Sequence, residues 1–215
     1  MKDVTIYFIR HGETYLNKFG KMQGWADAPL TEQGIADAHK TGERLADTAF
    51  DAVYASDLGR TQRTAEIICS ENRYADGLVI QPRSEWRESF FGSFDGSFSD
   101  YTYGKLAEVA GIDAKDIFKR MTIDEISETM KKADPEHASE TNEEVRKRLR
   151  KGLSDVVAEA PEGGARVMVV THGNVIRLLV AMIDPTIEVR RELKNSGVTT
   201  VQMHGDEAVV TGFNE

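Results

Sequence analysis

The sequence predicts an α/β protein: a three-layer α/β/α sandwich around a mostly parallel sheet, with an inserted helical cap over the C-terminal edge of the sheet. Short β-branched segments alternate along the chain with segments of helical spacing, a pattern typical of parallel sheets covered on both faces. Two of the strand segments are apolar throughout, which favours burial on both sides. From residue 84 to 140 the alternation is less regular. We therefore expect one domain over residues 1–215, with the cap inserted at about residues 90–140.

The first strand and the first helix are separated by a long loop. Val4–Ile9 is β-branched or aromatic throughout and predicts a buried strand. A glycine-containing loop follows over Gly12–Leu30. Thr31 is a suitable N-cap for a helix, and its apolar residues recur at helical spacing at Ile35, Ala38 and Leu45.

A second strand, a second helix and a third strand follow. Ala52–Ala55 predicts a short strand, and either Ser56 or Asp57 is expected to cap the next helix. The inward-facing residues of that helix are Leu58, Ala65 and Ile68. Leu78–Ile80 predicts the third strand, which Pro82 ends.

The stretch from Ser84 to Glu140 holds most of the aromatic residues and two or three short helices. Thr122 with Glu125 matches the capping-box pattern at the start of one of them. Thr141 with Glu144 matches it again and opens a longer helix that runs towards Pro161.

The last third of the chain returns to strands and helices. Val167–Val170 predicts a fourth buried strand, and Gly173–Met182 predicts a helix. Val198–Met203 and Ala208–Gly212 are expected to pair as a hairpin around His204, Gly205 and Asp206.

Charge and cysteine content exclude several classes of partner. The 215 residues include 27 Lys and Arg against 36 Asp and Glu, a net charge of −9, which disfavours nucleic acids and anionic membranes. The basic run over residues 146–151 is interpreted as a solvated helix, because acidic residues dilute it. A single cysteine, Cys69, and an N-terminal apolar run too short for a secretory signal favour a cytoplasmic protein. We expect a monomer or a homodimer.

Three segments place polar residues directly after strands. Arg10 and His11 follow the first strand, Arg60 follows the second, and His172 follows the fourth. The carboxyl ends of parallel strands meet at one edge of a sheet, so these side chains are expected to converge. Two arginines and two histidines beside helix N-termini would bind an anion, and phosphate is the natural ligand.

Phosphoryl transfer explains why two histidines are needed. A neutral imidazole can be the nucleophile, while a second, protonated imidazole and two guanidiniums offset charge on the transferred group. Metal ligation is the rival use, but no helical His-x-x-x-His is present and two arginines would repel a divalent cation. We expect neither a metal nor a cofactor. Glu85 and Glu88 both follow the third strand, and either one is a candidate proton donor.

Several motifs together are similar to one known family. Arg10-His11-Gly12-Glu13-Thr14 resembles the signature of the histidine phosphatase superfamily, which includes cofactor-dependent phosphoglycerate mutases. Further matching segments follow in the same order: Gln23-Gly24-Trp25-x-Asp27-x-Pro29-Leu30-Thr31-x-x-Gly34, Ser56-Asp57-Leu58-x-Arg60-Thr61-x-x-Thr64-Ala65 and Thr171-His172-Gly173. The resemblance covers residues from about 4 to 200.

The resemblance implies a role for each site residue. His11 would be the phosphorylated nucleophile, and the phosphate would be bound by Arg10, Asn17, Arg60 and His172, with His172 also counted as catalytic. The family pattern Arg-Glu followed by two spaced glycines falls on Arg87-Glu88, Gly92 and Gly96, so it favours Glu88 over Glu85 as general acid and later base. Asp95 replaces the usual Glu before the second glycine, a change expected to matter little.

The resemblance leaves three functions to weigh. We favour a metal-independent phosphomonoesterase that hydrolyses small phosphate esters through phosphohistidine, over a phosphoglycerate mutase of the same family. The insertion is short, and its only Lys-Arg pair, Lys119-Arg120, falls in a predicted helix. A non-catalytic phosphate-binding module is the remaining alternative, but His11, Glu88 and His172 are all present.

The substrate is expected to be a small phosphorylated molecule, with inorganic phosphate as the other ligand. The substrate-pocket candidates are Thr14, Lys21, Gln23, Gly24 and Trp25. Phe19, Met22, Trp25, Phe90 and Phe91 are candidate apolar walls, although core packing is favoured for Phe91. Lys18 and Lys21 are candidates for a second anionic group of the substrate, against the simpler interpretation of solvated lysines.

Overall fold

A single six-stranded sheet forms the centre of the protein, whose computed structural model describes residues 2–205 and 207–215. The strand order is β3-β2-β4-β1-β5-β6. The pairs β3–β2, β2–β4 and β4–β1 are parallel, whereas β5 runs antiparallel to both β1 and β6. The strands are β1 (Asp3–Arg10), β2 (Ala52–Ala55), β3 (Ile80–Pro82), β4 (Ala165–Thr171), β5 (Val198–His204) and β6 (Glu207–Gly212). The α/β fold class is confirmed, and the antiparallel part is the predicted C-terminal hairpin; Asp206 of its expected turn lies outside the described residues.

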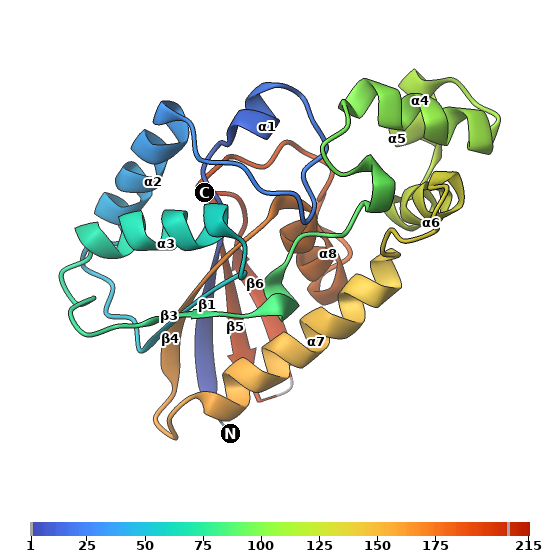
Figure 1. The fold of residues 1–215 in the computed structure, drawn as a ribbon. Coiled ribbons are helices and arrows are strands. Elements are labelled where there is room, and N and C mark those ends of the chain that lie inside the picture. The colour runs from blue at the N-terminus through green and yellow to red at the C-terminus, as the bar shows by residue number, and fades with distance from the viewer. Residues whose placement is uncertain (1, 206) are drawn as a thin grey trace.

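Helices cover both faces of the sheet (Figure 1). On one side lie α2 (Glu32–Arg44) and α3 (Gly59–Glu71), and on the other lie α7 (Asn142–Glu159) and α8 (Gly173–Ile183). Alternate residues of β1 enter the two cores: Ile6 and Phe8 pack with α7 and α8, whereas Ile9 packs with α3. Burial on both faces explains why successive residues over Ile6–Ile9 of this strand are all apolar or aromatic.

The cap is built from short helices with a hydrophobic cluster of their own. It contains α4 (Ser99–Ala110), α5 (Ile117–Arg120) and α6 (Ile123–Ala133), which lie beside the upper end of α8 in Figure 1. Three 3₁₀ turns, Ser84–Trp86, Gly92–Phe94 and Ala114–Asp116, connect these parts. The buried residues of the cluster are Met22, Phe94, Leu106, Ala107, Ile117 and Met130. The division of the chain into one domain with an insertion at 90–140 stays a prediction.

The predicted helix caps are correct at three of four positions. Thr31, Thr122 and Thr141 are N-caps, and the latter two form complete capping boxes with Glu125 and Glu144. Neither Ser56 nor Asp57 caps α3. Its N-cap is Leu58, so no N-cap side chain accepts a hydrogen bond from the first turn of the helix. The Asp57 carboxylate is instead bound by the Arg87 guanidinium at 2.6 Å.

Two further boundaries differ from the sequence-based expectation. The loop after β1 contains a short helix, α1 (Tyr15–Lys18), which Thr14 caps. The third strand lies two residues later than predicted and includes Pro82. Because β3 is an edge strand with a parallel partner on one side only, a residue without an N–H is tolerated there. None of the described helices combines the length and apolar character needed to cross a bilayer.

Candidate active site

The predicted cluster forms where the first, second and fourth strands end. His11 follows β1, Arg60 lies in the first turn of α3, and His172 is the N-cap of α8. The rings of His11 and His172 are 5.2 Å apart between centroids, and Arg60 Nη2 is 3.0 Å from His172 Nδ1. Residues far apart in sequence therefore line one buried site.

The position of the proton on His11 follows from its hydrogen bond. Its Nδ1 lies 2.8 Å from the carbonyl oxygen of Gly12. Because a carbonyl only accepts, Nδ1 carries the proton and the lone pair is on Nε2. Burial and the charges of Arg60 and Arg10 lower the pKa of His11 well below the usual value, so the ring is neutral at neutral pH. A Cβ at Gly12 would lie 2.5 Å from the Gly34 oxygen, so only glycine fits beside this histidine.

His172 has the opposite arrangement of donor and acceptor. A guanidinium only donates, so His172 Nδ1 accepts from Arg60 and the proton of the neutral ring is on Nε2. Burial and Arg60 lower the pKa of His172 well below its usual value. The expectation of a protonated second imidazole is therefore wrong for this structure. His172 instead offers a neutral N–H donor.

An ion pair and hydrogen bonds to backbone oxygens fix the guanidinium of Arg60. Its guanidinium is 3.0 Å from the Asp27 carboxylate and donates to the carbonyl oxygens of Gly24 at 2.6 Å and Ala26 at 2.8 Å. Asp95 in turn accepts hydrogen bonds from the backbone N–H groups of residues 24, 25 and 26. This carboxylate fixes the loop that positions Arg60, and the expectation that Asp in place of the usual Glu matters little stays a prediction.

Unpartnered donors collect around the two histidines. Among the described residues, six buried side-chain polar atoms lack a hydrogen-bond partner, and four of them are nitrogens of this site: Arg10 Nε, Gln23 Nε2, Arg60 Nε and His172 Nε2. Gln23 is oriented by its oxygen, which accepts from Thr14 Oγ1 at 2.6 Å. Buried donors are normally satisfied, so four together define a site for an anion.

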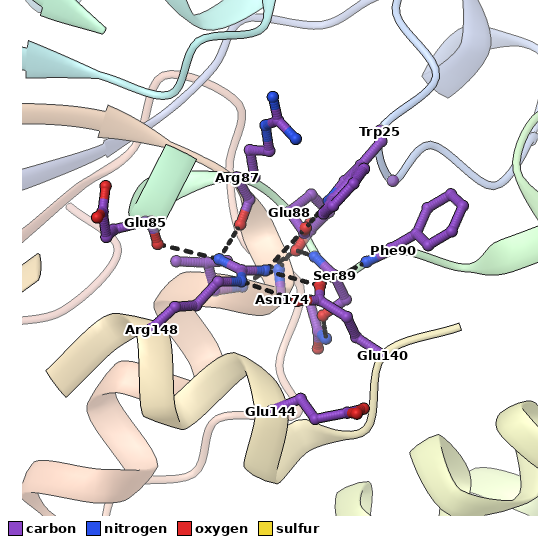
Figure 2. A network of polar contacts seen from close by, with 12 residues as sticks. Trp25, Glu85, Arg87, Glu88, Ser89, Phe90, Glu140, Glu144, Arg148 and Asn174 are labelled. Atoms are coloured by element: carbon purple, nitrogen blue, oxygen red, sulfur yellow. Dashed lines mark hydrogen bonds and ion pairs between the residues drawn. The ribbon is translucent and has the colours of Figure 1, made fainter. Parts of the chain in front are cut away.

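Glu88 lies at the N-terminus of α8, beside Asn174 (Figure 2). Its carboxylate accepts from the backbone N–H groups of Ser89 at 2.9 Å, Asn174 at 3.0 Å and Val175 at 3.2 Å. Glu85 points elsewhere, to an ion pair with Lys151 Nζ at 2.7 Å. Of the two acidic candidates, only Glu88 contacts the helix that carries His172.

Arg148 supports the segment that carries Glu88 (Figure 2). Its guanidinium pairs with both oxygens of Glu140 at 3.0 Å and donates to the backbone oxygens of residues 85, 87 and 88. The interpretation of its basic run as a solvated helix is therefore wrong for Arg148. Its spacing was the available signal, since Arg148 is three residues after Val145 and four before Gly152, both on the buried face.

The remaining candidates lie at the rim of the site. Trp25 Nε1 donates to the backbone carbonyl oxygen of Glu88 at 2.9 Å. The Trp25 ring stacks on Phe90, with 4.7 Å between ring centroids. Asn17 accepts from the Thr14 N–H through Oδ1, as part of the cap of α1. Lys21 lies over the Phe98 ring of the cap segment, with Nζ 4.8 Å from its centroid. The structure thus brings Thr14, Gln23, Gly24 and Trp25 to the site and places Lys21 against the cap.

The apolar wall candidates divide into three groups. Met22 is buried in the cap cluster, and Phe91 packs against the same cluster, as favoured for that residue. Phe19 is 57% exposed and takes no part in a wall. Trp25 and Phe90 remain as the stacked pair beside Glu88. No three His, Cys, Asp or Glu side chains within residues 2–205 and 207–215 are grouped as metal ligands.

The fold and the paired histidines define an enzyme of a phosphoryl-transfer class. The model of the histidine phosphatase superfamily (branch 1) matches residues 6–215, and the chain belongs to this family. It is therefore a superfamily enzyme, a mutase or a phosphatase.

Particular relatives match over nearly the whole chain. A protein of Erwinia tasmaniensis named probable phosphoglycerate mutase GpmB is 30% identical, over 97% of this chain and 89% of its own length. The crystal structure of phosphoglycerate mutase from Bacillus anthracis str. Sterne is 31% identical and has a TM-score of 0.93, covering 100% of this chain and 94% of that one. Bacillus stearothermophilus YhfR is 27% identical with a TM-score of 0.79, covering 99% and 97%.

Proposed function

We propose that the protein is a metal-independent phosphomonoesterase that hydrolyses small phosphate esters through a phosphohistidine on His11. The observation that carries this proposal is the set of four unpartnered nitrogen donors beside His11, whose free lone pair is on Nε2. Arg10, Asn17, Arg60 and His172 hold the phosphoryl group, and Glu88 is the general acid and later the base.

The first step transfers the phosphoryl group to the enzyme. His11 Nε2 attacks phosphorus in line with the ester oxygen, and the P–O bond breaks with its electrons on the leaving oxygen. That oxygen takes the proton of the Glu88 carboxyl group, so an alcohol leaves. Phosphohistidine and a Glu88 carboxylate remain. The Nδ1–H bond to Gly12 keeps the ring oriented throughout.

The second step hydrolyses the intermediate. Glu88 takes a proton from water as the water oxygen attacks phosphorus, and the N–P bond breaks with its electrons returning to His11 Nε2. The products are inorganic phosphate, neutral His11 and a protonated Glu88 carboxyl group. The donors from Arg10, Arg60 and His172 are fixed beforehand by their own contacts, so they stabilise the transferred charge without rearranging.

A phosphoglycerate mutase is the second candidate, and the names of the Erwinia and Bacillus anthracis relatives favour it. A mutase returns the phosphoryl group of phosphohistidine to another hydroxyl instead of to water. The cap supports hydrolysis instead, because its Lys119-Arg120 pair is exposed on α5 and Lys119 lies 3.8 Å from Asp116.

A panel of phosphate esters in EDTA tests the proposal. It includes p-nitrophenyl phosphate, alkyl phosphates and 3-phosphoglycerate with its bisphosphate primer, and it scores both phosphate release and isomerisation. The proposal expects phosphate release that EDTA leaves unchanged. Isomerisation much faster than release would favour the mutase, and loss of activity in EDTA would contradict metal independence.

A further inference from the structure

Arg177 is a cation of α8 that the proposed reaction does not use. Its Nε donates to the Val189 oxygen at 3.0 Å and its Nη2 to the Arg191 oxygen at 3.2 Å. These two bonds hold the guanidinium from one side. Within the described residues Nη1 makes no hydrogen bond, so one end of a well-anchored cation is free to contact a ligand.

Gly173 places this free end beside the phosphate site. A Cβ built on Gly173 would lie 3.3 Å from Arg10 Nε and 3.6 Å from Arg177 Nη1. The two guanidiniums therefore flank the same glycine, and Arg10 Nε is itself buried without a partner. Any larger side chain at position 173 would occupy the space between them.

The charges around Gly173 are not neutralised by ion pairs. Among the described residues, neither Arg10 nor Arg177 has a carboxylate within ion-pair distance. Of the nearest carboxylates, Glu88 is bound by backbone N–H groups and Glu192 is exposed. Burial and mutual repulsion lower the pKa of Arg10, and burial lowers that of Arg177. Two cations held together in this way favour binding of an anion.

We propose that Arg177, with Arg10, forms a subsite for a second anionic group of the substrate. The proposal rests on the proposed function, because Arg10 would then bind between the phosphoryl group on His11 and this second group. The preferred substrates are small phosphate esters with a carboxylate or a second phosphoryl group, over esters of neutral alcohols. The second anion was expected at Lys18 or Lys21, but Lys21 packs on Phe98 of the cap segment.

Matched substrate pairs test the subsite. One pair is 3-phosphoglycerate and glycerol 3-phosphate, and the other is fructose 1,6-bisphosphate and fructose 6-phosphate. In each pair only the first carries an additional anion. The measured quantity is the ratio of kcat/KM within a pair, with release and isomerisation both counted. In the wild-type protein, a ratio above one for the first pair shows that the subsite accepts a carboxylate. A ratio above one for the second pair shows that it accepts a phosphoryl group.

Arg177→Gln should lower that ratio about 10- to 100-fold, the value of one hydrogen bond to a charged group. Arg177→Lys, which keeps the charge, should give an intermediate ratio and guards against a folding defect in the first variant. Arg63→Gln changes an exposed arginine of α3 that pairs with Glu66, and it should leave the ratio as in the wild type.

Two outcomes would overturn the subsite: wild-type ratios near one for both pairs, or an unchanged ratio in Arg177→Gln. Failure of the proposed function looks different, since the wild-type protein would then release no phosphate even from p-nitrophenyl phosphate. In that case, calorimetric binding of 3-phosphoglycerate and glycerol 3-phosphate to the same variants provides the ratio and decides the subsite by the same criterion.

Discussion

At the scale of single residues, the two histidines of the site differ in which ring nitrogen carries the proton. The Gly12 carbonyl keeps the proton on Nδ1 of His11, and Arg60 keeps it on Nε2 of His172. One ring therefore has a free lone pair on Nε2, which the proposed reaction uses as the nucleophile, and the other is an N–H donor, although both are buried and both have lowered pKa values. In the proposed reaction Glu88, bound at the start of α8, is the proton donor.

Glu88→Gln tests the role of the acid. The leaving oxygen of an alkyl ester needs a proton and that of p-nitrophenyl phosphate does not, so we expect kcat/KM, which reports the first step alone, to fall about 10²- to 10⁴-fold for alkyl esters and much less for the aryl ester. A series of esters with graded leaving groups measures this as a steeper dependence of log kcat/KM on leaving-group pKa. An equal loss across the series would contradict the acid role.

At the scale of elements, the site depends on two supports whose roles the sequence motifs do not specify. The Asp95 carboxylate holds the backbone of residues 24–26, and the carbonyl oxygens of that loop hold Arg60. Arg148 of α7 holds the segment that carries Glu88. Each support joins the cap or its flanks to the sheet edge.

Asp95→Asn should weaken the loop support. The amide keeps one oxygen of the carboxylate and replaces the other with a donor, which faces backbone N–H groups. We expect the free energy of unfolding to fall by about 1–3 kcal/mol and KM for p-nitrophenyl phosphate to rise as Arg60 loses its fixed position. Urea denaturation and steady-state kinetics measure both. Asp100→Asn, at an exposed position of α4, is the control, and equal stability of the two variants would refute the role of Asp95.

Arg148→Met should lower the free energy of unfolding more than the same substitution at a solvated arginine does. It leaves the half-buried Glu140 unpaired and removes the bonds to three backbone oxygens, a loss of about 3 kcal/mol or more. Arg150→Met on the same helix is the matched control, because Arg150 is exposed and pairs only with exposed Glu143. Similar denaturation midpoints for the two variants would restore the interpretation of a solvated helix.

At the scale of the whole molecule, an acidic body with a net charge of −9 encloses a small basic site. The surface disfavours polyanions, while the donors around His11 suit a single phosphate. Burying two neutral histidines beside arginines also has a consequence for stability, because the unfolded chain protonates them near pH 6.5 and the folded protein does so only at lower pH.

The free energy of unfolding should therefore decrease as the pH falls below about 6.5. In this range the unfolded state binds more protons than the native state, so each of the two histidines contributes a slope that grows from about 0.7 kcal/mol per pH unit at pH 6.5 towards a limit of about 1.4 at lower pH. Urea denaturation between pH 7.5 and about 5.5 measures it, and His11→Asn should lose about half of the slope. Stability independent of pH in this range would contradict buried neutral rings.

The sequence predicts the parts of this molecule that depend on local pattern. Strand ends followed by Arg10, Arg60 and His172 predict their meeting at one sheet edge, since parallel topology requires it. Two capping boxes and the β-branched and aromatic first strand follow from local patterns of residue type. The spacing of Arg148 indicates that it faces inward, but its hydrogen-bond partners and the proton position on His172 depend on tertiary contacts, which no local pattern specifies.

The proposed function depends on the covalent bond to His11, and direct trapping tests it. Protein mixed with ³²P-labelled substrate is quenched in alkali within the first turnover, because phosphohistidine survives alkali and is lost in acid, and the labelled peptide is then mapped. We predict label on His11, none in His11→Ala, and release of the label as inorganic phosphate when the wild-type protein is left unquenched. Label on another residue, or full turnover by His11→Ala, would contradict it.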